Sequence, residues 1–171
     1  MERDDVRTIA LTKFAASHGK QQIAMAGASK VTIDQDGHIS LDAARISLPG
    51  GGSLNLKNLA YGREASGDIL LDETGLAFLQ AYGVPIQDGK LRGRVRLAGG
   101  KGQVTLQIDE AHIDELPEGL PAFITAEGDW DGRALRLKSN VRFGDKGTPI
   151  IITSSLPLTP NNGGLPVPNL N

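Results

Sequence analysis

Residues 90–97 read Lys90-Leu91-Arg92-Gly93-Arg94-Val95-Arg96-Leu97, with a cation at every even position and an aliphatic residue at three of the four odd positions. Successive side chains of a β-strand point to opposite faces of a sheet, so this alternation predicts a strand with one solvated and one apolar face. The row of cations is more typical of a solvated sheet face than of a phosphate-binding surface. The apolar face must pack against something, and its partner is the main question that the sequence poses.

The same alternation recurs along most of the chain, and turn residues separate the alternating segments. The expected strands are Val6–Phe14, Gln22–Gly27, Lys30–Asp34, His38–Ala43, Arg45–Leu48, Ser53–Leu59, Gly67–Asp72, Lys90–Ala98, Gln103–Ile108, Ala122–Asp129, Arg133–Lys138, Val141–Phe143 and Ile150–Leu156. A turn-rich piece is expected from Ala111 to Pro121. The pattern predicts an all-β protein.

One segment departs from the strand period. Thr74–Gly83 has apolar residues spaced near 3.6, a Thr suited to an N-cap and a terminal Gly, and it predicts a short helix over Thr74–Tyr82. The dipeptides Asp36-Gly37 and Asp131-Gly132 each predict a hairpin with a type I′ turn, in which both central residues have positive φ.

Composition excludes several classes of protein. The chain has 171 residues, a net charge of −2 from 18 basic and 20 acidic residues, and no cysteine. The charge balance gives no electrostatic basis for nucleic-acid binding, and the lack of cysteine excludes disulfides and thiolate metal sites. Neither a signal peptide nor an apolar run long enough for a membrane helix is visible. If the protein belongs to the cell envelope, we expect its export signal or anchor to lie outside this sequence.

The sequence offers no catalytic constellation. His18, His38 and His112 lack a recognised metal-binding spacing, and Asp34–Gly37 resembles the opening of a calcium loop without its later ligands. No nucleophile elbow or phosphate-binding motif is present. The sequence therefore predicts no enzyme, no catalytic residue, no metal site and no cofactor.

Two architectures could use so many apolar strand faces. One is a closed β-sandwich, in which two sheets bury these faces against each other and the domain serves a structural role. The other is a long, curled sheet whose apolar inner face stays open as a trough and is covered by lipid acyl chains. The scarcity of aromatic residues (4 Phe, 2 Tyr, 1 Trp) and the 22 glycines favour the curled sheet.

The chain also resembles a known family. Residues 91–99 and 102–106 resemble the paired "G-x-V-x-L" strands of the TamB family, which contains the large inner-membrane subunit of the translocation and assembly module. Residues 126–137 are similar to that family's "Trp-x-x-Gly-x-Leu-x-Leu" hairpins, and 156–158 to its "Leu-Pro-Leu" strand ends. The resemblance covers about residues 20–158. One departure is the connection Ala98–Gly102, which is shorter than the family's usual one.

TamB belongs to the AsmA-like group of bridge-type lipid-transfer proteins. The resemblance implies a long curled, taco-like β-sheet with an apolar concave interior, forming part of a bridge across the periplasm of a Gram-negative bacterium. It implies a parent protein anchored in the inner membrane, phospholipid movement to the outer membrane, and work with an outer-membrane barrel protein of the assembly module. An alternative within the same setting is a chaperone-like β-surface that pairs with outer-membrane proteins during assembly.

On this reading residues 1–158 form a single β-groove segment, a piece of a much longer envelope protein that continues into neighbouring β-groove segments. Residues 159–171 are expected to be a disordered tail. The residues expected to face lipid are Val31, Ile33, Ile39, Leu41, Ile46, Leu48, Leu54, Leu56, Ile69, Leu71, Leu91, Val95, Leu97, Val104, Leu106, Ile108, Ile124, Leu135 and Leu137. Of these, the resemblance itself carries over Leu91, Val95, Leu97, Val104, Leu106, Leu135 and Leu137.

Overall fold

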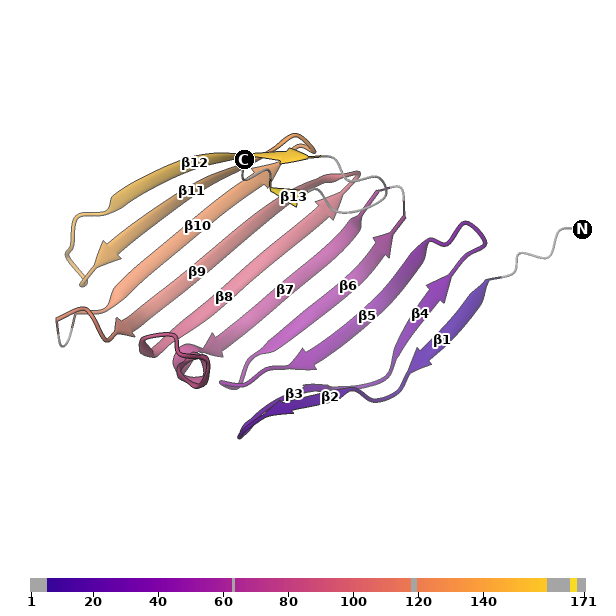
Figure 1. The fold of residues 1–171 in the computed structure, drawn as a ribbon, viewed down its shortest axis with the longest axis horizontal. Helices are drawn as coiled ribbons and strands as arrows, with labels where there is room; N and C mark the ends of the chain where they lie inside the picture. Colours follow the sequence, from indigo (N-terminus) through magenta and orange to yellow (C-terminus); the bar gives the residue numbers. More distant parts are fainter. Residues whose placement is uncertain (1–5, 63, 118–119, 160–166, 169–171) are drawn as a thin grey trace, which may run out of the picture.

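A computed structural model describes residues 6–62, 64–117, 120–159 and 167–168 of the chain. Within these residues the fold is one 13-stranded sheet with a single short helix, and all strand pairs are antiparallel (Figure 1). The prediction of an all-β, curled, open sheet is confirmed.

The strands follow one another closely in the sequence. They are β1 (Arg7–Leu11), β2 (Ala15–His18), β3 (Gln21–Met25), β4 (Ser29–Ile33), β5 (Ile39–Ser47), β6 (Ser53–Tyr61), β7 (Ser66–Gly75), β8 (Ile86–Ala98), β9 (Lys101–Ile113), β10 (Ala122–Trp130), β11 (Ala134–Phe143), β12 (Ile150–Thr159) and β13 (Val167–Pro168). The helix η1 (Leu76–Tyr82) lies between β7 and β8.

The order of strands in the sheet is almost the order in the chain. From β4 to β13 each strand pairs with the next, and β1 pairs with β4. The hairpin β2–β3 leaves this path, because β3 pairs with the far end of β5 at Met25 and Ile46. One edge of the sheet is therefore divided between two short pieces, whereas the other edge is formed mainly by the ten-residue strand β12.

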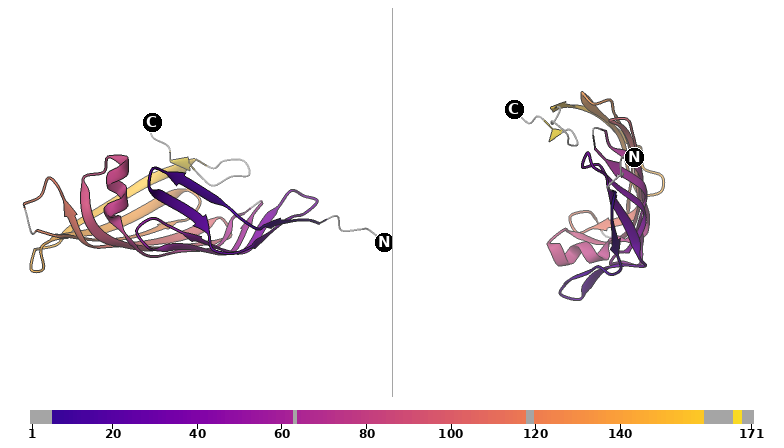
Figure 2. Two further views of the ribbon diagram at one scale, coloured as in Figure 1. Left: turned by 90° about the horizontal axis from the view of Figure 1, so that it is seen from below. Right: turned by 90° about the vertical axis from the view of Figure 1, so that its right-hand side faces the viewer.

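The sheet curves into a trough that is open along its length (Figure 2). The views show η1 and β13 on the hollow side, and the strands cross the trough obliquely. Register shifts interrupt the ladders β6–β7 and β8–β9, and Asn58 and Glu110 have positive φ at these places. Such bulges add twist and bend, as the curvature of the sheet requires.

The core is too small for a sandwich. Among the described residues, only three apolar side chains are fully buried: Leu76, Ala111 and Ala122. No second sheet covers the first over the described ranges, so the alternative of a closed β-sandwich is wrong.

The predicted helix exists but is shorter and of a different type. It is a 3-10 helix over Leu76–Tyr82, and Gly83 ends it in the left-handed conformation, as expected. The predicted N-cap is wrong. Thr74 belongs to β7, is 1 % exposed, and its hydroxyl donates to the carbonyl of Asp72, while Gly75 takes the capping position without a side chain.

Both Asp-Gly hairpins form, but not with the predicted turn. Only the glycines Gly37 and Gly132 have positive φ, and the Asp before each does not. The amide of Gly37 donates to the carbonyl of Asp34, as in a type I turn followed by a left-handed glycine. The two-residue turn with positive φ at both positions is instead Gly99-Gly100, between β8 and β9.

Strand boundaries differ most where the alternation is interrupted. The expected pairs of segments on either side of Ala44 and Asn140 are each one continuous strand, and β2 was not expected. The turn-rich piece expected from Ala111 begins only after Ile113. The tail prediction for 159–171 falls largely outside the described residues, apart from Thr159 and β13.

Candidate functional site: an apolar trough

The strand register places the apolar positions on one face. Cross-strand partners in an antiparallel pair lie on the same side of the sheet, so partners can be followed from strand to strand. One such row is Ile46, Leu54, Leu71, Gly93, Leu106, Ala126, Ser139 and Ile152. A neighbouring row is Ala44, Leu56, Ile69, Val95, Val104, Gly128, Leu137 and Ser154. The trough floor consists of these rows and those flanking them.

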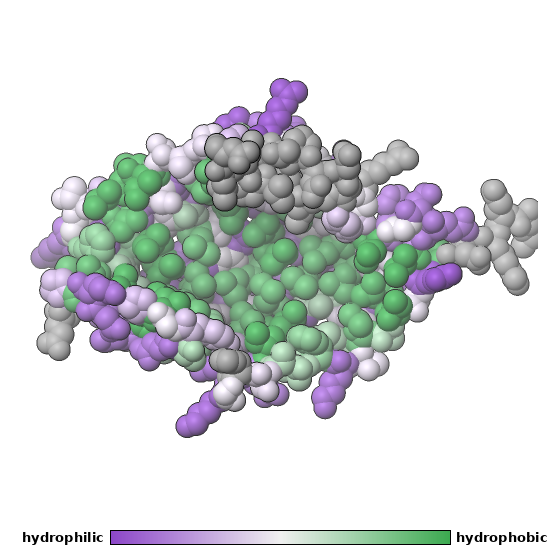
Figure 3. Space-filling model, in the orientation of Figure 1, coloured by the Kyte–Doolittle hydropathy of each residue, from purple (hydrophilic) through white to green (hydrophobic). Residues whose placement is uncertain are grey.

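This face is the concave one. The helix η1 lies on the hollow side of the sheet and packs against Leu91 and Ile108, which are cross-strand partners in the row beside Leu106 (Figure 2). The space-filling view onto the same side shows a continuous apolar floor with polar residues along its margins (Figure 3).

The residues expected to face lipid share this face. All of them except Leu48 occupy paired strand positions whose register leads to the concave side. The link to the N-terminal strands is Leu59, whose side chain lies over Gly67, the partner of Leu97. Leu59 pairs with Leu41, and Leu41 pairs with Val31. Leu48 follows the end of β5, where its amide donates to the carbonyl of Gly52.

Sequence reasoning missed several members of the floor. They are Leu59, Tyr61, Trp130, Val141, Ile150, Ile152 and Leu156, which the register places in the same rows. Alternation within each strand could have identified most of them, but Leu59 and Tyr61 follow the break in alternation at Asn58.

The floor is not uniform. Between β6 and β9 its rows are almost entirely Leu, Ile and Val, whereas β10–β12 contribute Ala126, Gly128, Ser139 and Ser154. Ile150 and Ile152 on β12 are 52 % and 53 % exposed, so large apolar surface faces solvent at this end.

One margin of the trough is closed by η1. Leu76 is 1 % exposed, and with Ala111 and Ala122 it forms a cluster that Leu79, Leu91 and Ile108 surround. The start of the helix is held in place because the amide of Gly75 donates to the carbonyl of Gly50 at 3.0 Å. The trough therefore has a packed margin beside an open floor.

The single tryptophan of the chain stands on the concave face. Trp130 pairs with Gly102 and Leu135, and its ring lies over Gly102 so closely that a Cβ there would be 2.2 Å from a ring atom. The glycine thus makes room for the indole, which places a natural fluorescent reporter beside Leu97 and Leu156 in the same row.

On the convex face, the charged side chains of β8 are paired with carboxylates of the sheet. Arg92 contacts both Glu73 and Asp109, Arg94 donates to Asp68 at 2.8 Å, and Arg96 lies 3.4 Å from the same carboxylate. The hydrogen bond from Arg94 first, and then the charges of Arg94 and Arg96, lower the pKa of Asp68. The cations of β8 form the solvated sheet face that the sequence predicts, and each of these arginines has an acidic partner.

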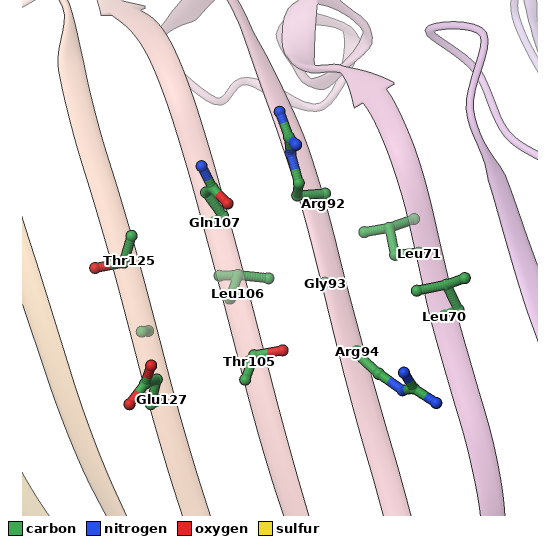
Figure 4. A pocket seen from close by; sticks show the side chains of 11 residues that line it. Leu70, Leu71, Arg92, Gly93, Arg94, Thr105, Leu106, Gln107, Thr125 and Glu127 are labelled. Atoms are coloured by element: carbon green, nitrogen blue, oxygen red, sulfur yellow. The ribbon is translucent and has the colours of Figure 1, made fainter.

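A shallow depression of about 280 Å³ lies on this convex face. Figure 4 shows Arg92, Arg94, Gln107 and Glu127 around it on adjacent strands. The guanidinium groups are already engaged by carboxylates of the sheet, and Gln107 donates to Asp109. The depression offers no nucleophile paired with a base.

The histidines with described side chains are paired with carboxylates. One side-chain ligand atom each of Asp34, Asp36 and His38 lies within 4.8 Å of the others in the β4–β5 turn, and the sequence spacing does not predict that His38 joins the two carboxylates. The Asp34 carboxylate accepts from the His38 amide and contacts its ring, and the amide bond chiefly lowers the pKa of Asp34. His112 contacts Asp88. The His18 side chain lies outside the described part.

Comparison with known proteins gave no match to a family model, a curated protein or a solved structure. In the described part of the chain, no helix has the length and apolar character needed to cross a membrane.

Proposed function

We propose that the trough binds lipid acyl chains and that the protein is a non-catalytic segment of a hydrophobic groove carrying phospholipids between the inner and outer membranes. The observation that carries the proposal is the continuous, solvent-open apolar floor on the concave face of a single-layer sheet (Figure 3). Soluble proteins rarely expose an apolar surface of this extent unless a ligand or partner covers it.

The chemistry of the floor suits acyl chains. Each methylene transferred from water to such a surface contributes roughly 0.8 kcal/mol, so a chain is retained without polar contacts. Aliphatic rows without keyed pockets, such as Leu56, Ile69, Val95 and Val104, provide little specificity and allow movement along the trough.

The cellular setting of the proposal rests on the resemblance to the TamB family. The protein would work in the periplasm, within a parent chain anchored in the inner membrane of a Gram-negative bacterium. Its partners would be phospholipids, neighbouring β-groove segments of that parent chain, and an outer-membrane barrel protein of the assembly module, which connects the segment to outer-membrane biogenesis.

The test uses Trp130 as reporter. Phospholipid vesicles brominated on the acyl chains should quench Trp130 fluorescence on transfer of lipid to the protein, because bromine must come near the indole. Native mass spectrometry of the same sample should show phospholipid bound to the folded chain. A folded protein with no bound lipid and no quenching would refute the proposal.

Two adjacent residues of β9 provide a matched pair of variants. Val104 lies on the floor and Thr105 on the convex face, opposite Arg94. Val104→Asp should abolish quenching while the urea midpoint stays near that of the unaltered protein, because the floor is open to water. Thr105→Asp should retain both quenching and stability. Equal loss of quenching in both variants would contradict binding on the concave face.

A further inference from the structure

The two edges of the sheet differ in how they are protected. On the β1 side the edge is divided between β1 and the β2–β3 hairpin, strands of four or five residues, and β1 contains Arg7. The β12 edge is ten residues long, and among the described residues its only partner there is β13, at Leu158 and Thr159. Residues 150–157 thus present a free ladder within the described part of the chain.

Over Ile150–Leu156, strand β12 lacks the features by which edge strands avoid pairing, and Pro157 interrupts the edge only near its end. The strand contains no charged residue, whereas each strand from β4 to β11 contains at least one. Ile150, Ile151 and Ile152 are 52 %, 61 % and 53 % exposed and occupy both faces. A long, uncharged, apolar edge strand is a site for strand addition.

The side of β12 that is free can be identified from Pro157. Proline has no amide hydrogen, and within a sheet it occupies positions whose N–H would point away from the neighbouring strand. Pro157 pairs with Ala134 of β11, so the odd-numbered residues of β12 direct their amides and carbonyls to the open edge. Ile151, Thr153 and Ser155 therefore hold the unpaired donors and acceptors.

We propose that the β12 edge binds the β12 edge of a second copy of this chain, antiparallel and centred on Thr153. In this register Ile150 meets Leu156 of the other copy and Ile151 meets its Ser155. In this register even-numbered residues pair with even-numbered residues, and cross-strand partners lie on the same side of a sheet. The concave floors of both copies therefore lie on the same side and form one longer trough. Pairing across a two-fold axis closes after two copies.

The charge distribution favours a second copy as the occupant. Two identical uncharged strands can pair without like-charge repulsion. In a symmetric dimer, any charge introduced into β12 would be present on both of the paired strands. Pairing of β12 with the β1 edge of another copy would instead be head-to-tail and form open chains. In a longer parent chain the next groove segment would pair at this edge instead, so the proposal applies to this chain by itself. It does not require lipid, so it can fail while the proposed function holds.

The experiment is sedimentation equilibrium of the lipid-free protein over a wide concentration range, with a monomer–dimer equilibrium as the expected result. Thr153→Pro removes a free-edge donor and should raise the dimer dissociation constant at least about tenfold. Thr153→Lys should do the same, because Thr153 meets Thr153 of the other copy and the two introduced charges would lie directly opposite each other. Thr125→Lys, the same charge on the convex face of β10, is the control and should leave the dimer unchanged.

Circular dichroism and urea midpoints close to those of the unaltered protein establish that the edge variants are folded. A monomer at every concentration would overturn the proposal. So would a dimer that both edge variants retain, since the copies would then meet through their concave faces. Assembly beyond the dimer would indicate head-to-tail pairing and also overturn it, as would a monomer whose edge captures only an added, foreign β-strand peptide.

Discussion

Strand β8 carries two surfaces that are built differently. On the convex side Arg92, Arg94 and Arg96 each reach a carboxylate on a neighbouring strand. On the concave side Leu91 packs against the η1 cluster, while Val95 and Leu97 continue onto the open floor. The arginines of the convex face are paired within the sheet, whereas the apolar side chains of the concave floor remain open to solvent. The lipid of the proposed function would cover this open floor.

The comparison also indicates what holds the fold together. Surface ion pairs contribute little to stability, and the open floor buries less apolar area than a closed core would. Stability therefore depends on the backbone ladders and on the small cluster around Leu76. The open part of the concave face does not pack as a core, so the proposed lipid binding would be separate from folding.

The largest effect is expected where the concave face is covered. Leu76→Ala removes the largest fully buried apolar side chain and should lower the free energy of unfolding by about 2–5 kcal/mol. Val95→Thr, on the open floor, replaces a methyl group by a hydroxyl that water can reach and should cost less than about 1 kcal/mol. Urea unfolding followed by circular dichroism measures both, and a cost at Val95 equal to that at Leu76 would mean that the floor is a closed core.

The alternation in the sequence was sufficient to predict the sheet and most of the residues on the concave floor. Within Lys90–Leu97 each side chain points to the face that strict alternation predicts, because no bulge interrupts these eight residues. The period fails at Asn58 and Glu110, where a residue with positive φ shifts the pairing. Neither an asparagine nor a glutamate by itself predicts a bulge, so the structure was needed to place Leu59 on the concave face.

The turn chemistry and the helix show a second limit. Asp-Gly marks a hairpin correctly at residues 36–37 and 131–132, but the type of turn depends on loop length, which the flanking strands set. Thr74 has the sequence character of an N-cap, yet its pairing with Leu91 draws it into β7 and starts the helix two residues later. Long-range pairing decides both cases.

A smaller effect is expected beneath Trp130, at the boundary between the open floor and its margin. Gly102→Ala places a methyl group against the indole ring, which must move, and should cost about 1–3 kcal/mol. The emission maximum of Trp130 should shift with it. Gly27→Ala is the control, because nothing lies within 4 Å of a Cβ there. Equal stability of the two variants would show that the indole does not rest on Gly102.

The smallest effect concerns the polar side, in the turn that joins β10 to β11. The pKa of Asp131 is lowered to about 2, first by the amide of Arg133, then by the Arg136 guanidinium and the amide of Ala134. A carboxyl whose pKa is lower in the folded state stabilises the protein above its unfolded pKa of about 4 and loses this contribution as the pH falls towards 2. Asp131→Asn should therefore make the fall in urea midpoint between pH 4 and pH 2 less steep.

Arg136→Gln distinguishes the causes of this acid sensitivity. It removes the ion pairs of Arg136 with Asp129 and Asp131 but leaves both amide bonds to Asp131 in place. Since the amide of Arg133 is the leading cause of the lowered pKa, Arg136→Gln should retain most of the acid dependence that Asp131→Asn removes. If both variants flatten the profile equally, charge pairing on the convex face, and not the turn itself, controls it. The concave floor has no carboxylate in its central rows, so lipid-dependent quenching in the unaltered protein should follow folding alone across this pH range.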